Sequence, residues 1–270
     1  MKTFDVRIRL RKNRIEVTGK SEDVDEAISA IVALRQQGEK ITDKKSPISE
    51  ISEGAILKTV RGDEIFPQTR SQKKYVKAMN SNPITIATGP AGTGKTFLAV
   101  CCALKFFFEG KFSKIILSRP VVEAGEKLGF LPGDFEEKVY PYLAPIYDAF
   151  IFLIGAHAFN KYKRTGVIEI VPLAYMRGRT LDNAFIILDE AQNTTIAQMK
   201  MILTRLGPNG VIVVNGDDTQ IDLEKSVPSG LIHAKKILKG IRGISFVEFS
   251  QRDVIRHPIV KKIVSAYQEA

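Results

Sequence analysis

Three short stretches of the sequence place polar residues where chemistry on a phosphate could occur. GPAGTGKT (89–96) follows an apolar run and opens a helical one, the context that the motif G-x-x-x-x-G-K-[ST] requires. Its glycines let backbone N–H groups curl toward phosphate oxygens, and the helix start adds the positive end of its dipole. A glycine-rich turn without a ligand is the alternative. The predicted phosphate-binding residues are Gly89, Pro90, Ala91, Gly92, Thr93, Gly94, Lys95 and Thr96.

Two of these side chains carry specific predictions. Lys95 is expected to reach the β- and γ-phosphates of ATP, and the Thr96 hydroxyl is expected to hold Mg²⁺.

The second stretch, FIILDEAQN (185–193), ends an apolar run in carboxylates. Parallel strands bring their carboxyl ends to one edge of a sheet, where open α/β sheets bind ligands. Asp189 is predicted to organise Mg²⁺ through water, and Glu190 to act as general base on an attacking water. The alternative is a pair of helix-capping carboxylates, because Asp and Glu also suit a first helical turn.

The third stretch, VIVVNGDDTQID (211–222), has the same form. Asp217 and Gln220 are expected near the γ-phosphate, where they can sense its presence and orient the water. Asp218 and Asn215 suit a turn as well as they suit a ligand site, and the sequence does not choose between the two.

Six apolar runs of strand length must position these residues, and helical stretches separate them. The runs are too apolar to have one wet face, which predicts an α/β fold with a mostly parallel sheet and helices on both faces. They are ITIATG (84–89), KIILSR (114–119), VIEIVP (167–172), AFIILD (184–189), VIVVN (211–215) and ISFVEF (244–249).

The chain before this core predicts a separate small unit. Residues 1–38 are expected to form a ββα unit, with a hairpin over 4–18 and a helix that opens at Ser21. Residues 39–68 are polar and weakly patterned, which predicts a linker with a short hairpin near its end. The main domain is predicted over 69–270.

Composition narrows the class of protein. The 270 residues carry a net charge of +10, which favours a polyanionic partner, although a merely basic soluble protein remains open. Cys101 and Cys102 are adjacent, which excludes an ordinary disulfide framework and a zinc site. The amino terminus has no signal-peptide core, and the apolar stretch 142–155 is too short to span a membrane. A cytoplasmic protein without a membrane segment is expected.

The motifs together resemble a known family. The phosphate loop, DEAQ and GDxxQ resemble the core of superfamily I helicases. Longer stretches resemble the PhoH family more closely, and the similarity runs from about Thr69 to Tyr267. These stretches are SRPVVEAGEKLGFLPGD (118–134), PLAYMRGRT (172–180), DEAQNTT (189–195) and QRDVIRHPIV (251–260).

The resemblance implies a RecA-like P-loop ATPase core that assembles as a homo-oligomeric ring, often a hexamer. It implies ATP hydrolysis linked to RNA, with helicase-like behaviour. Some relatives are associated with a YbeY-type endoribonuclease and with ribosomal RNA maturation. Others are fused to a PIN ribonuclease, for which 270 residues leave no room, so nuclease activity of this chain itself is not expected.

The resemblance implies roles for two residues that come earlier in the chain than DEAQ. Gln72 resembles a glutamine that reads adenine, with an exposed glutamine at a helix start as the alternative. Arg119 resembles a residue that in helicases touches the nucleic-acid strand, with an ion pair to Glu123 or Glu126 as the alternative.

Further arginines lie later in the chain. Arg256 resembles an arginine that completes the neighbouring subunit's site in a ring, and Arg252 competes for that role. Either can instead be a surface arginine. Arg177 and Arg179 can bind RNA phosphate or join a strand to its loop. His257 is expected to be structural.

The amino-terminal unit departs from the family pattern. The family has a longer, KH-like stretch there, whereas this one is short and lacks the GxxG loop that clamps RNA. Alternation places Arg7, Arg9 and Arg11 on one face, which serves either as a track for phosphates or as a solubilising surface.

Two other functions are weighed against an RNA-linked ATPase. A nucleoside kinase can pair a phosphate loop with DEAQ, but it normally adds a cysteine-rich zinc lobe and lacks GDxxQ. An ATP-switched ring could bind a protein partner without unwinding. A second RecA domain is missing from the chain, so unwinding would require a ring or a partner.

Overall fold

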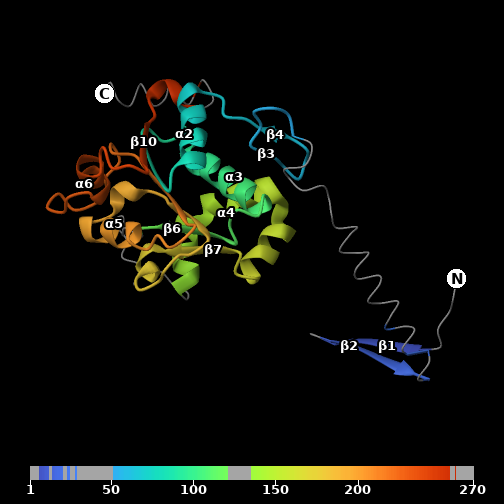
Figure 1. Ribbon diagram of the computed structural model, residues 1–270. Coiled ribbons are helices and arrows are strands. Elements are labelled where there is room, and N and C mark those ends of the chain that lie inside the picture. The colour runs from blue at the N-terminus through green and yellow to red at the C-terminus, as the bar shows by residue number, and fades with distance from the viewer. Residues whose placement is uncertain are drawn as a thin grey trace. The chain divides into compact units, whose positions relative to one another are not determined.

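The structure is a computed structural model of the 270-residue chain, which divides into two units, Met1–Ser46 and Pro47–Ala270. Figure 1 shows the elements of both units. The described residues are 6–11, 14–20, 23–24, 28, 51–120, 135–255 and 259.

The first unit contains the predicted hairpin. Strands β1 (Val6–Arg11) and β2 (Arg14–Gly19) pair antiparallel, with Leu10 opposite Ile15. Of the helix predicted from Ser21, residues 23, 24 and 28 are helical, and the others lie outside the described residues.

The second unit is built on a six-stranded sheet in the order β10-β5-β9-β8-β6-β7, and every adjacent pair is parallel. All six predicted strands are present, each within one residue of its expected bounds, which confirms the α/β class. The strands are β5 (Ile84–Thr88), β6 (Lys114–Arg119), β7 (Ile168–Pro172), β8 (Ala184–Leu188), β9 (Val211–Gly216) and β10 (Ile244–Glu248).

Helices cover both faces of this sheet, as predicted (Figure 1). The side chains of strand β8 explain why both faces need helices, because they alternate between two apolar cores. Phe185 and Ile187 pack with α2, α3 and α4, whereas Ile186 and Leu188 pack with α5 and α6. The helical elements are α2 (Arg70–Ser81), α3 (Lys95–Phe108), α4 (Phe135–Arg164), η2 (Leu173–Met176), η3 (Ala191–Asn193), α5 (Ile196–Leu203), α6 (Gly230–Ile237) and η4 (Gln251–Asp253).

The second unit begins at Pro47, earlier than the main domain predicted from residue 69. The short hairpin of β3 (Leu57–Lys58) and β4 (Glu64–Ile65) forms inside the predicted linker, as the sequence suggested. However, Ile56 and Leu57 are buried in the core beneath α3, and Val60 N–H donates to the Leu153 carbonyl of α4. Burial of these two apolar residues makes the hairpin part of the core, and the polar residues around them hid this in the sequence.

Helix α4 extends well past the stretch 142–155. The prediction that this apolar stretch is too short to span a membrane is therefore wrong about its length. Its segment Tyr142–Arg164 is the one stretch in the described chain that is long and apolar enough to cross a membrane, with a mean hydropathy of 1.4. Two features fit a core helix instead. Gly155 breaks the helical geometry (φ 77°, ψ 155°), and one face of the segment, including Phe150, is buried in the core.

Helix α2 is joined to the sheet by a buried hydrogen bond. Tyr75 donates its hydroxyl to Asn215 Oδ1 at 2.5 Å, and both side chains are fully buried. Burial raises the pKa of the Tyr75 hydroxyl well above its ordinary value. Asn215 Nδ2 has no hydrogen-bond partner among the described residues. Asn215 therefore serves the packing of α2 against the end of β9.

We predict that Tyr75→Phe lowers the free energy of unfolding by about 1–3 kcal/mol, because it leaves the buried Asn215 amide with no partner on either side. Urea unfolding of the variant and the wild type measures this difference. Tyr162→Phe, on a half-buried ring of α4, is the control and should change stability less. Equal stability of Tyr75→Phe and wild type would contradict this role.

Candidate nucleotide site

The phosphate loop runs from the end of β5 into α3. Gly89 has a φ of 140°, and a Cβ there would collide with the Phe249 carbonyl oxygen and lie 2.7 Å from Phe249 Cβ. Gly94 has a φ of 82° and precedes the first residue of α3. Only glycine fits both conditions, so the loop can curl closely around the start of the helix.

Lys95 lies inside this curl. Its Nζ donates to the carbonyls of Gly89 at 2.6 Å and Pro90 at 2.9 Å, and to Thr93 Oγ1 at 3.3 Å. Burial lowers the pKa of the Lys95 ammonium, and nearby carboxylates, Asp217 first, oppose that effect. The loop therefore brings the Lys95 ammonium and the N-terminus of α3 close together.

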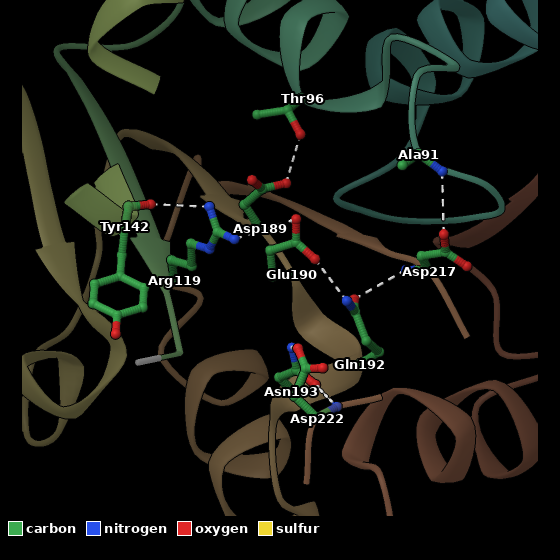
Figure 2. Close-up of polar contacts among 10 residues, drawn as sticks. All are labelled: Ala91, Thr96, Arg119, Tyr142, Asp189, Glu190, Gln192, Asn193, Asp217 and Asp222. Carbon is green, nitrogen blue, oxygen red and sulfur yellow. Dashed lines mark hydrogen bonds and ion pairs between the residues drawn. The ribbon is translucent and has the colours of Figure 1, made fainter. Parts of the chain in front are cut away.

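Thr96 and Asp189 meet, as the two halves of the predicted metal site should. The Thr96 hydroxyl donates to Asp189 Oδ1 at 2.6 Å, and Figure 2 shows the two side chains pointing toward each other. Burial, with the neighbouring Glu190 charge, raises the pKa of the Asp189 carboxyl from 3.8 to about 6.

These groups fit Mg²⁺, because a hydroxyl and a carboxylate are hard oxygen ligands. In the part of the chain that the structure describes, no cluster of three His, Cys, Asp or Glu side chains could hold a metal alone. Mg²⁺ bound together with a nucleotide is usually held by one or two protein oxygens and by the phosphates.

Glu190 occupies a strained position after β8. Its backbone is left-handed (φ 51°, ψ 39°), which costs a non-glycine residue about 1–3 kcal/mol. Gln192 Nε2 donates to its Oε2 at 2.6 Å, and Arg119 Nη2 lies 3.4 Å from its Oε1 (Figure 2). The ion pair of Arg119 is thus with the predicted general base. Its alternative partners, Glu123 and Glu126, lie outside the described residues.

Gln192, which the sequence analysis did not single out, connects the two acidic strand ends. Its Oε1 accepts the backbone N–H of Asp217 at 2.9 Å, while its Nε2 binds Glu190. Asp217 in turn accepts the Ala91 N–H of the phosphate loop at 3.1 Å. Asp217, expected near the γ-phosphate, therefore also braces the loop. The signal for Gln192 was its place inside the DEAQ motif.

A second link joins the same segments. Asn193 Nδ2 donates to Asp222 Oδ2 at 3.0 Å, and the Asp222 N–H donates to Asn193 Oδ1 at 2.8 Å. This reciprocal pair fixes the chain after GDDTQ against η3.

One cavity of about 250 Å³ collects most of the predicted site. Gln220, which is exposed, lines it, whereas Asp218 turns to an ion pair with Lys235 at 3.0 Å. The lining residues are Ala91, Gly92, Thr93, Gly94, Lys95, Thr96, Phe97, Asp189, Glu190, Gly216, Asp217 and Gln220.

Gln72 is placed differently from either expectation. It is buried, so it is not an exposed glutamine at a helix start. Its Nε2 donates to the Thr93 carbonyl at 3.0 Å, and its Oε1 accepts the Gln68 N–H at 2.7 Å. The Nε2 end of the amide thus joins α2 to the phosphate loop, whereas the Oε1 end binds the backbone just before α2. The adenine-reading role remains a prediction.

The other arginines that the sequence singled out have different surroundings. Arg179 Nη2 lies 2.6 Å from Glu169 Oε2, which joins strand β7 to its loop, and Arg177 and Arg252 are exposed. Arg256 and His257 lie outside the described residues. The residue before them, Ile255, donates its N–H to the Gly92 carbonyl of the phosphate loop at 3.0 Å. The QRDVI stretch therefore reaches the loop.

We predict that Asp189→Asn stabilises the protein at pH 8 more than at pH 4. The raised pKa means that the charged carboxylate opposes folding; this cost is full above pH 6 and disappears below pH 3.8, where both states are protonated. The difference between the two pH values should be about 1–3 kcal/mol, measured as free energy of unfolding. Asp182→Asn, at an exposed position, is the control. An Asp189→Asn effect equal at both pH values would contradict the burial argument.

Comparison with solved structures finds distant likenesses. The UvsW helicase from bacteriophage T4 is 13% identical, with a TM-score of 0.41 over 70% of this chain and 61% of that one. A large terminase from a thermophilic bacteriophage is 12% identical, with a TM-score of 0.41 over 74% of this chain and 50% of that one. Likenesses at this level do not bear on activity.

Comparison of sequences is decisive for the family. The family model described as "PhoH-like protein" matches residues 64–268. A PhoH-like protein of Bacillus subtilis is 48% identical over 99% of this chain and 89% of its own length. A PhoH-like protein of Synechocystis is 48% identical over 85% and 70%, and Protein PhoH of Escherichia coli is 44% identical over 75% and 58%. The chain belongs to the PhoH-like protein family.

Proposed function

We propose that this chain is a cytoplasmic ATPase that binds and hydrolyses ATP with Mg²⁺ and acts on RNA by helicase-like remodelling. The observation that carries the proposal is the single cavity that joins the phosphate loop to Asp189, Glu190, Asp217 and Gln220. A phosphate site alone would bind a nucleotide. A carboxylate beside it, that of Glu190 at the end of β8, adds the means to activate a water.

Each side chain has a task in this reaction. Lys95 and the loop N–H groups would bind the phosphates, and Thr96 with Asp189 would hold Mg²⁺. Bound Mg²⁺ would offset the charge of the β- and γ-phosphates. Glu190 accepts a proton from the attacking water, and Gln220 orients that water at the mouth of the cavity.

The proposal of RNA as substrate has two supports. The net charge of +10 favours a polyanion, and the family resemblance favours RNA among polyanions. We further propose that the chain works as a homo-oligomeric ring. A YbeY-type endoribonuclease acting in ribosomal RNA maturation is the candidate protein partner.

We predict that Lys95→Ala abolishes nucleotide binding, whereas Glu190→Gln keeps binding and lowers hydrolysis by about 10²–10⁴-fold. The change to Gln removes the base and keeps the shape, and its one amide oxygen can still accept from Gln192 or from Arg119. Binding is measured with a fluorescent ATP analogue and hydrolysis by phosphate release. Normal hydrolysis by Glu190→Gln would rule out Glu190 as the general base.

Arg256 gives the ring proposal its own test. We predict that mixing Arg256→Ala subunits with Lys95→Ala subunits restores part of the activity, because an intact phosphate loop can then meet an intact arginine across an interface. Ring formation by the mixture is verified by mass measurement before ATP hydrolysis is assayed. Verified mixed rings without recovered activity would place Arg256 outside the neighbour's site.

A further inference from the structure

The carboxylate of Glu190 is held from two sides. Gln192 Nε2 donates to Oε2 at 2.6 Å, and Arg119 Nη2 lies 3.4 Å from Oε1 (Figure 2). The two partners differ in character. Gln192 is buried and belongs to the same motif, whereas Arg119 comes from the end of β6 and its side chain is 23% exposed. Of the two contacts, the one with Arg119 is therefore the one that a ligand could reach.

Arg119 also connects the site to a helix. Its Nη1 donates to the Tyr142 carbonyl of α4 at 2.9 Å (Figure 2). The guanidinium therefore lies between the predicted general base and α4. Because the guanidinium contacts both Glu190 and α4, a movement of Arg119 changes both contacts.

Arg119 lines a second groove, of about 690 Å³, on the α4 side of the carboxylates. This groove also contains Pro145 and Phe152, and it shares Thr96, Phe97, Asp189 and Glu190 with the nucleotide cavity. The rings of Phe97 and Phe152 have centroids 6.0 Å apart, and Phe152 is 43% exposed. Accessible aromatic rings beside an arginine suit one nucleotide unit of a single strand, with a base on the rings and a phosphate on the guanidinium.

We propose that Arg119 is a latch, in the sense that its ion pair restrains Glu190. Single-stranded RNA bound in this groove would release Glu190, because an RNA phosphate binds the guanidinium in its place. The proposal rests on the RNA-linked ATPase proposed above and adds how RNA would control that site. A guanidinium binds phosphate through paired hydrogen bonds, which its single long contact with Glu190 does not provide. Asp189 and Glu190 repel a phosphate, so the guanidinium must turn away from them to bind it. That turn frees Glu190 to face the attacking water.

The test compares Arg119→Ala and Arg119→Lys with wild type and with Arg205→Ala. Arg205 is a matched control, because it is a half-buried arginine that donates to the carbonyls of Met201 and Arg179. For each protein, the kcat and KM for ATP are measured without and with a single-stranded oligouridine. RNA affinity is measured by fluorescence anisotropy of the labelled oligouridine, and folding by thermal unfolding.

The latch predicts that Arg119→Ala raises kcat without RNA about two- to fivefold, the size expected for loss of one partly exposed ion pair. Its stimulation by RNA should fall toward one and its RNA affinity should drop. Arg119→Lys keeps the charge and should lie between Arg119→Ala and wild type, while Arg205→Ala should match wild type.

Two outcomes would overturn the latch alone, given wild type whose ATP hydrolysis RNA stimulates. They are a fall in the RNA-free kcat of a folded Arg119→Ala variant, and RNA stimulation in that variant equal to wild type. Wild type that hydrolyses ATP without any stimulation by RNA would overturn the latch together with the proposed action on RNA. A fall in kcat would make Arg119 a positioning residue that holds Glu190 in its working orientation. Wild type that does not hydrolyse ATP would overturn the proposed function and the latch with it.

Discussion

The parallel register of the central strands is the constraint on which the site depends. Thr88 of β5 pairs with Gly216 of β9, and Leu188 of β8 pairs with Val214 of β9 and with Ser118 of β6. The residues that follow these positions therefore emerge side by side at one edge. A slip of one residue in any pair would turn the side chains of that strand to the opposite face and separate the carboxylates from the phosphate loop.

A chain of buried and partly buried polar contacts then makes the three strand ends one unit. Ala91 of the loop donates to Asp217, the Asp217 N–H donates to Gln192, and Gln192 donates to Glu190. Such a network is costly to break at Gln192 and Asp217, because these residues are buried and a lost partner leaves a polar group there without a hydrogen bond. A displacement of the phosphate loop is therefore coupled to the general base through two side chains. Arg119 continues the same chain of contacts to α4.

The sequence predicted what depends on local pattern. Apolar runs of strand length and the spacing of GPAGTGKT and DEAQ were enough for the sheet, the phosphate loop and the Thr96–Asp189 pair. Contacts between distant segments could not be predicted from pattern. Gln72 was expected at a ligand or in solvent, yet tertiary packing directs its amide to Thr93, 21 residues away. The hairpin at Leu57 was assigned to a linker, because burial of two apolar residues among polar ones leaves no periodicity to detect.

The most direct measurement of the central claim is steady-state ATP hydrolysis by the wild-type chain with single-stranded RNA, with single-stranded DNA and with neither. Glu190→Gln supplies the blank. If one coupled network joins the nucleotide cavity to a bound strand, RNA should raise the rate and DNA should raise it less. Hydrolysis indifferent to both nucleic acids would contradict this account, and it would favour a ring that uses ATP as a switch to bind a protein partner.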